Sequence, residues 1–123
     1  MGARHIGDIS HLVEIAEPNI GVVLNVGQAH LGEFGSREKI AEAKGELIAG
    51  LPEDGIAVLG NYDPFTPVMA EGMGLRKVIF GESNSCDVRA ADIEIKEGRA
   101  NFDLVTKAGR APVSLQQIGR AHV

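Results

Sequence analysis

Hydrophobic and polar positions in the first two thirds of the chain alternate between short apolar runs and amphipathic stretches. Residues 20–26 (IGVVLNV), 55–60 (GIAVLG) and 76–80 (RKVIF) are largely apolar runs rich in β-branched residues. Such runs are typical of strands covered on both faces of a parallel sheet. Residues 8–16 and 37–49 carry apolar side chains at helical spacing, which predicts an amphipathic helix in each. Strands that alternate with helices in this way indicate right-handed βαβ units, and so an α/β fold.

Residues with known preferences at helix ends mark where these helices begin and stop. Asp8 is the predicted N-cap of the first helix and Ser36 that of the second, because their side-chain oxygens can accept a hydrogen bond from the first turn. Gly50 follows the second helix, where glycine commonly ends one. Pro64 predicts the start of a further short helix, which should fade near Gly72.

The pattern changes in the last third of the chain. Residues 88–95, 100–106 and 112–115 alternate apolar and polar side chains, and Gly-containing dipeptides at 97–98 and 108–109 separate them. Dipeptides of this kind between alternating runs are typical of hairpin turns. We therefore expect a small antiparallel β appendage after the parallel strands.

The composition fits one modest soluble domain. With 123 residues, 44% of them hydrophobic and 24% charged, the chain is long enough to bury a core. No apolar run approaches the roughly 20 residues of a membrane helix, and no secretory signal pattern is present. A net charge of −5, with few aromatic residues, argues against a nucleic-acid surface. The lone Cys86 cannot form an internal disulfide, which suits a reducing cytoplasm.

Polar residues follow the first two predicted strands. Asn25 lies at the end of the first strand, with His30 in the loop beyond it, and Asn61 and Asp63 follow the second. In open parallel sheets, ligands bind beyond the carboxyl ends of the strands. The alternative is structural, since Asn and Asp are common turn formers and a histidine in a polar loop is more often solvated than a ligand.

Lys44 falls within the apolar stripe of its helix, four residues after Ile40 and four before Ile48. One explanation is that its stem packs on the apolar face while the ammonium reaches water, and the pattern alone slightly favours this. The other is a partly desolvated amine that reacts with CO₂ to form a carbamate. That group would be an anion whose oxygens can bind Mg²⁺.

Familiar catalytic motifs do not resolve these alternatives. The chain contains no G-x-x-x-x-G-K-[ST] phosphate loop, no G-x-G-x-x-G, no CxxC and no HExxH. The residue pattern taken alone leads to an α/β fold with a possible polar site, and not to a reaction.

Several segments together resemble the central domain of the Mur ligase family. They are Met1–Ile9 (MGARHIGDI), Asn25–Ser36 (NVGQAHLGEFGS) and Ala43–Leu47 (AKGEL). Asn61–Pro64 (NYDP) is similar to the family's N-A-D-D-type turn, and Gly119–Val123 (GRAHV) to the start of its G-[RKE]-H-N-x-x-N-A-L-A segment. The likeness covers nearly the whole chain, in order and with natural spacing.

This resemblance implies a fold and an activity. The fold would be a partial parallel Rossmann-like sheet of the P-loop ATPase type with flanking helices. Residues 1–81 would belong to the ATP-binding α/β domain, and residues 82–123 to an antiparallel β subregion of it. The family joins a carboxylate to an amine with ATP and Mg²⁺, through an acyl phosphate. Ala29 before the loop histidine points to the member that joins D-Ala-D-Ala to UDP-MurNAc-tripeptide. The full-length enzyme would be a cytoplasmic monomer without a membrane span or a nucleic-acid partner.

The resemblance also implies residue roles. His30 would be a catalytic residue and a Mg²⁺ ligand, and Lys44 a catalytic lysine that supports Mg²⁺ as its carbamate. Asn61 and Asp63 would shape the nucleotide edge of the site. His122 would approach the adenine, at a position where the family commonly has Asn.

Departures from the family pattern limit what this stretch can do alone. The phosphate loop and a metal-binding Glu would precede Met1, and the helix with the second Asn of the adenine segment would follow Val123. We therefore expect a piece of a longer enzyme that is inactive by itself. The alternatives are another Mur-type or folylpolyglutamate-type ligase with a different amine acceptor, and a non-catalytic nucleotide-binding module with the same fold.

Overall fold

The computed structural model describes residues 5–27 and 35–118. The described strands form one six-stranded sheet in the order β1-β2-β3-β4-β5-β6. Contacts divide the chain into two compact units, Met1–Ile79 and Phe80–Val123. The assignment of residues 1–81 and 82–123 to two parts of one ATP-binding domain stays a prediction. No helix within the described ranges is long and apolar enough to span a membrane.

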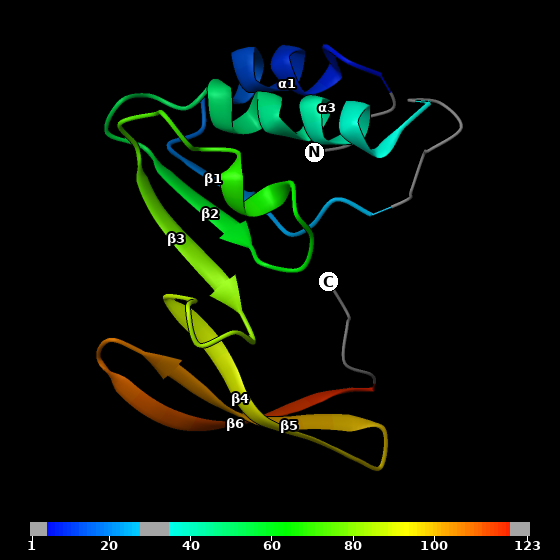
Figure 1. The fold of residues 1–123 in the computed structure, drawn as a ribbon, viewed down its shortest axis with the longest axis vertical. Helices are drawn as coiled ribbons and strands as arrows, with labels where there is room; N and C mark the ends of the chain where they lie inside the picture. Colours follow the sequence, from blue (N-terminus) through cyan, green and yellow to red (C-terminus); the bar gives the residue numbers. More distant parts are fainter. Residues whose placement is uncertain (1–4, 28–34, 119–123) are drawn as a thin grey trace. The chain divides into compact units, whose positions relative to one another are not determined.

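The first unit has the predicted alternation of strands and helices (Figure 1). Its elements are α1 (Asp8–Ala16), β1 (Ile20–Val23), α3 (Arg37–Ala49), β2 (Ile56–Gly60), the 3-10 turn η1 (Thr66–Val68) and β3 (Arg76–Gly81). Strands β1 and β2 pair in parallel, with Ile20 opposite Ile56 and Val23 opposite Leu59. The α/β fold with a parallel sheet is thereby confirmed. The first strand ends at Val23, three residues earlier than predicted.

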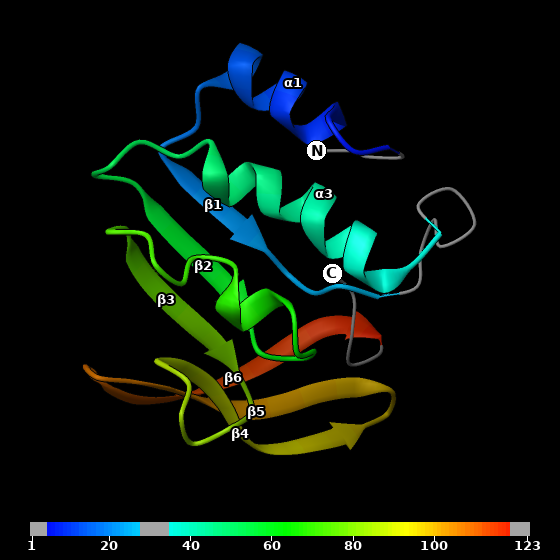
Figure 2. The same ribbon diagram turned by 45° about the horizontal axis from the view of Figure 1, so that its top comes forward.

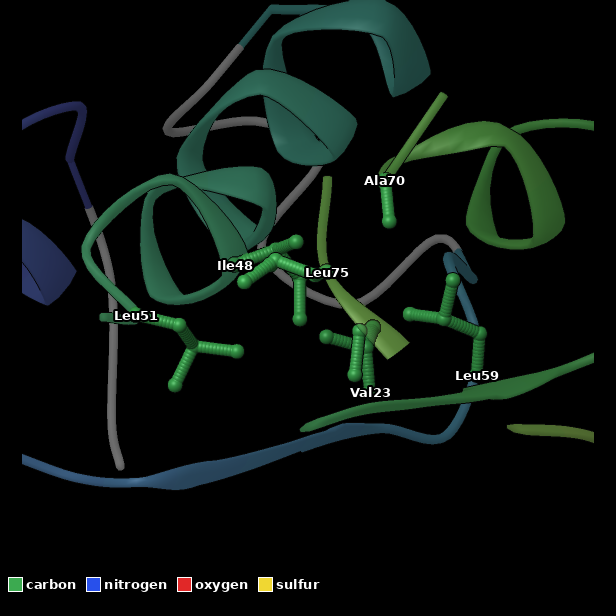
Figure 3. Close-up of a cluster of buried hydrophobic side chains, with 7 residues drawn as sticks. Val23, Ile48, Leu51, Leu59, Ala70 and Leu75 are labelled. Carbon is green, nitrogen blue, oxygen red and sulfur yellow. The ribbon is translucent and has the colours of Figure 1, made fainter. Parts of the chain in front are cut away.

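One face of this sheet carries the core (Figure 3). Figures 1 and 2 show α3 and η1 on the same side of β1 and β2. The core side chains come from the strands, from α3 and from the segments that follow α3 and η1: Val23, Ile48, Leu51, Ala57, Leu59, Ala70 and Leu75. Their burial accounts for the apolar runs of the strands and for the stripe on α3. A second cluster joins Val26, just beyond β1, to Ile40 and Ala43 of α3.

Within the described part of the chain the opposite face of β1 is exposed, and the expectation that both faces are covered stays a prediction for the longer protein. Ile20, Val22 and Leu24 are 56%, 49% and 39% exposed, while Gly21 and Val23 between them are buried. Successive side chains of a strand point to opposite faces; α3 packs on the face that carries Val23, and α1 packs against α3. The apolar run predicted the strand, but the number of covered faces depends on what packs there.

Helix ends agree with the sequence in part. Ser36 caps α3 as predicted, since its side chain accepts a hydrogen bond from the Lys39 amide at 3.3 Å. Asp8 is not the N-cap of α1, because Gly7 occupies that position without a side-chain cap. The Glu46 carboxylate of α3 accepts from the amides of Gly7 at 2.7 Å and Ser10 at 3.0 Å. A residue distant in sequence therefore takes the role predicted for Asp8.

The helix predicted from Pro64 is shorter than expected. Only Thr66–Val68 form a 3-10 turn, and irregular turns lead from it to β3. The Asp63 carboxylate caps this turn by accepting from the Phe65 and Thr66 amides, each at 2.8 Å. Short 3-10 turns are common connectors of this kind.

The second unit contains the predicted antiparallel strands. They are β4 (Val88–Lys96), β5 (Arg99–Thr106) and β6 (Gly109–Ile118). The β4–β5 turn is Glu97-Gly98, as predicted, with φ of 52° and 77°. Two positive φ values suit the primed turns that match strand twist. The β5–β6 turn is Lys107-Ala108, one residue before the predicted dipeptide.

Candidate functional site at the end of β1

The structure describes three of the five predicted site residues. Lys44, Asn61 and Asp63 lie within the described residues, whereas His30 and His122 lie outside them. Strands β1 and β2 run parallel with Val23 opposite Leu59, so the segments that follow them leave the sheet at the same edge. Asn61 and Asp63, which follow β2, therefore lie at the same edge as Asn25, which follows β1.

Lys44 reaches the chain just beyond β1. Its Nζ donates a hydrogen bond to the carbonyl oxygen of Asn25 at 2.9 Å. The side chain is half-buried, one turn before the fully buried Ile48 of α3. The ammonium thus binds a backbone carbonyl at the end of a strand instead of extending into open water. Both sequence-based explanations are compatible with this contact, and the carbamate on Lys44 stays a prediction.

Asp63 is surrounded by donors. Its Oδ2 accepts from the Val26 amide at 2.7 Å and from the Thr66 hydroxyl at 2.8 Å. Its Oδ1 accepts from the amides of Phe65 and Thr66, each at 2.8 Å. Burial by itself would raise the pKa of the Asp63 carboxyl, but these hydrogen bonds favour the charged form and lower the pKa below its ordinary value.

This arrangement limits what Asp63 can bind. A carboxylate offers about four lone-pair positions, and the four donors occupy that number. Asp63 therefore ties the residues that follow β1 to the turn after β2. Little acceptor capacity is left on its carboxylate for a ligand. Any effect of this residue on a bound nucleotide would pass through the backbone that it fixes.

Arg37 is a further residue of this region that the sequence reasoning missed. Its Nη2 donates to the Val26 carbonyl at 2.9 Å, and its guanidinium lies 5.4 Å from the centre of the Phe65 ring. A cation over an aromatic ring at this distance is attracted to it. The available signal was helical periodicity, because Arg37 precedes Lys44 by seven residues and so lies on the same face of α3.

Asn61 directly follows β2 and is half-buried. Its side chain belongs to the same turn as Asp63, and its predicted role at a nucleotide edge stays a prediction. The Asn61–Asp63 turn is tied to the end of β1 by the Asp63–Val26 hydrogen bond.

The described residues contain no ready cluster of metal ligands. Within residues 5–27 and 35–118, no three His, Cys, Asp or Glu side chains lie close enough to bind a metal ion. The oxygens of Asp63 are already used by donors. A carbamate on Lys44 would add an anionic oxygen ligand of the kind that Mg²⁺ takes, and this role of Lys44 stays a prediction.

A separate hollow of about 880 Å³ lies beside α1 and α3. Its lining includes Ser10, Glu14, Glu17 and Glu46, and none of the predicted site residues that the structure describes. It is therefore distinct from the Lys44 region.

Comparison with known proteins identifies similar chains. The family model described as the Mur ligase middle domain matches residues 1–123. The UDP-N-acetylmuramoyl-tripeptide–D-alanyl-D-alanine ligase of Mycobacterium tuberculosis is 47% identical over 120 residues, which are 97% of this chain and 24% of that protein.

Solved structures agree with the sequence comparison. A crystal structure of MurF from Acinetobacter baumannii matches with a TM-score of 0.87 and 36% identity, over 97% of this chain and 26% of that one. MurF from Thermotoga maritima, in complex with ADP, matches with a TM-score of 0.79 and 36% identity, over 93% of this chain and 26% of that one. The chain thus spans about a quarter of the length of these relatives.

Proposed function

Because this chain belongs to the Mur ligase family, we propose that it forms part of an enzyme that joins D-Ala-D-Ala to UDP-MurNAc-tripeptide in peptidoglycan synthesis. The observation that carries the proposal is the 47% identity, over 97% of the chain, to a ligase named for these substrates. The full-length enzyme would be a cytoplasmic monomer, and the stretch described above would be inactive without the rest of it.

The proposed reaction uses ATP and Mg²⁺. The substrate carboxylate attacks the γ-phosphate, ADP leaves, and the amine of D-Ala-D-Ala then displaces phosphate from the acyl phosphate to form the peptide bond. Mg²⁺, when bound, would offset negative charge on the phosphates. Support for a nucleotide comes from the ADP complex of the Thermotoga maritima relative.

Within this reaction we assign Lys44 the role of a carbamylated residue. The ammonium first loses a proton, the free amine attacks the carbon of CO₂, and a second N–H proton is then released. The product keeps one N–H and gains a carboxylate, so a cation becomes an anion that can bind Mg²⁺. The half-buried position and the contact of Lys44 with the Asn25 carbonyl support a fixed location for this group.

His30 is proposed as a second Mg²⁺ ligand, with Asn61 and Asp63 at the nucleotide edge and His122 near the adenine. Lys44 alone cannot complete a Mg²⁺ site, since this ion usually takes six oxygen ligands, several of them water.

The test uses the full-length protein that contains this chain. Phosphate release is measured with ATP, Mg²⁺, UDP-MurNAc-tripeptide and D-Ala-D-Ala, and omission of each substrate is the control. Release that depends on both substrates supports the proposal. Equal release with another amine acceptor would point to a different ligase, and no substrate-dependent release would exclude ligase activity.

Three substitutions separate the roles open to Lys44. Lys44→Ala should abolish activity, whereas Lys44→Glu should retain more because it restores an anionic oxygen. Lys44→Arg is the matched control, since it keeps a cation that can donate to Asn25 but cannot form a carbamate. An active Lys44→Arg enzyme would show that the positive charge suffices, and would contradict the carbamate.

A further inference from the structure

Two of the predicted site residues bind opposite ends of one peptide group. Lys44 Nζ donates to the Asn25 carbonyl at 2.9 Å, and the Val26 amide donates to Asp63 Oδ2 at 2.7 Å. That carbonyl and that amide belong to the single planar peptide between Asn25 and Val26. A cation at the carbonyl oxygen and a carboxylate at the N–H both increase the polarisation of this peptide group. Each of the two hydrogen bonds therefore strengthens the other.

Asp63 is the rigid partner in this arrangement. Besides Val26, it accepts from the Phe65 amide and from both the amide and the hydroxyl of Thr66, and Thr66 is fully buried. Lys44, by contrast, is a flexible side chain that, among the described residues, makes one polar contact, with the Asn25 carbonyl. The orientation of the Asn25 carbonyl is therefore set from the Asp63 side, and Lys44 follows it.

Arg37 fixes the next peptide along the chain. Its Nη2 donates to the Val26 carbonyl at 2.9 Å, and Val26 itself is 1% exposed among Ile40 and Ala43. Rotation of the Asn25–Val26 peptide would break the Asp63 contact and disturb this buried residue. The peptide that receives Lys44 is thus held on both sides.

We propose that Asp63 is a positioning residue for Lys44, acting through the Asn25–Val26 peptide. The inference rests on the proposed carbamate function of Lys44. A carbamate has a single N–H and is planar, so donation of that N–H to the Asn25 carbonyl fixes the plane in which its two oxygens lie. Asp63 sets the position of that carbonyl, and so the direction in which Lys44 presents its oxygens.

The experiment compares Asp63→Asn with wild type in the full-length enzyme. Asparagine keeps the shape but replaces one acceptor oxygen with an NH₂ group, so it cannot accept all four hydrogen bonds. Carbamate formation is followed by ¹³C NMR with labelled bicarbonate, and kcat and KM by phosphate release. Leu75→Ala, a buried core change away from these polar contacts, is the control for a general loss of stability.

We expect Asp63→Asn to raise the bicarbonate concentration for half-maximal carbamate signal about 10-fold, and to lower kcat about 10- to 100-fold, as is typical when a partner that orients a metal ligand is lost. Leu75→Ala should lower the unfolding temperature without moving the bicarbonate requirement. If Asp63→Asn does not fold, Asp63→Glu serves instead, because it keeps the charge while displacing the carboxylate.

The outcomes distinguish the two proposals. The positioning role alone would be overturned if the wild-type enzyme shows both a carbamate signal and substrate-dependent phosphate release, but the Asp63 variants behave like Leu75→Ala. A wild-type enzyme without either signal would overturn the proposed function, and the positioning role with it. A bicarbonate requirement raised only in the Asp63 variants supports the inference.

Discussion

Alanine substitution at two glycines of α3 and its C-terminus should change stability in opposite directions. Gly50→Ala should destabilise the first compact unit, and Gly45→Ala should stabilise it. Both glycines have backbone angles that alanine can adopt, since Gly45 lies inside α3 and Gly50 has a φ of −87°. The difference between them is the space available for one methyl group.

That space gives the magnitude. A Cβ on Gly50 would lie 2.5 Å from Cγ1 of Val13 in α1, about 1 Å closer than an ordinary carbon–carbon contact. Val13 is 8% exposed and β-branched, so few rotamers are open to it. Overpacking of this kind costs about 1–3 kcal/mol. Alanine recovers about 0.4–1 kcal/mol because it restricts the unfolded chain, which leaves a net loss of up to about 2.6 kcal/mol, with a middle value of about 1.3 kcal/mol.

Gly45 is the matched control. Apart from its chain neighbours and the backbone of α3 itself, no described atom lies within 4 Å of a Cβ built there. Glycine inside a helix costs about 0.5–1 kcal/mol relative to alanine. Gly45→Ala should therefore stabilise the chain by about that amount.

Urea unfolding followed by circular dichroism measures both changes as shifts of the midpoint at constant slope. In a Val13→Ala background the clash is removed, and Gly50→Ala should become neutral or stabilising. If Gly50→Ala were as stable as wild type with Val13 intact, or if Val13→Ala did not relieve it, the close approach of α1 and α3 would be wrong.

Further predictions concern the cap of α1, the loss of stability at acid pH and the exposed face of β1. Glu46→Ala should lower the free energy of unfolding by about 1 kcal/mol, as the loss of a helix cap does. Asp8→Ala should cost less, because the Asp8 carboxylate accepts from the exposed His5 amide. Urea midpoints compare the two variants, and equal losses would contradict the capping role of Glu46. Because the pKa of Asp63 is lowered in the folded state, its stabilisation is complete above the unfolded value of about 3.9 and is lost as pH falls through the folded pKa. An Asp63→Asn chain should accordingly show a flatter decline of unfolding free energy in acid, and an unchanged slope would speak against the lowered pKa. Sedimentation velocity of this chain over a range of concentrations tests the exposed apolar face of β1: we expect it to promote association and Val22→Lys to reduce that association. Association that Val22→Lys leaves unchanged would place the contact elsewhere.

The sequence alone determined the features that depend on neighbours along the chain. The order of strands and helices followed from hydrophobic periodicity, the Ser36 cap from a contact three residues away, and the Glu97-Gly98 turn from adjacent residues. The position of Lys44 on the inner face of α3 also followed from helical spacing. These features need no knowledge of which segments meet in space.

Contacts between distant segments were decided only by the tertiary structure. Asp8 has the residue type of an N-cap, yet Glu46, 36 and 39 residues from the amides it binds, takes that place because α3 packs beside α1. The apolar run of β1 has the same pattern whether one face or both are covered, so it did not predict the open face.

The candidate site shows the same division. Lys44 and Asp63 were both predicted from local pattern and family resemblance. Their connection through the Asn25–Val26 peptide depends on two hydrogen bonds that span 19 and 37 residues. Periodicity records which face a side chain occupies, but the partner on that face is set by the packing of β1, α3 and the turn after β2. For that physical reason the sequence named the residues, and only the tertiary structure showed that one peptide joins them.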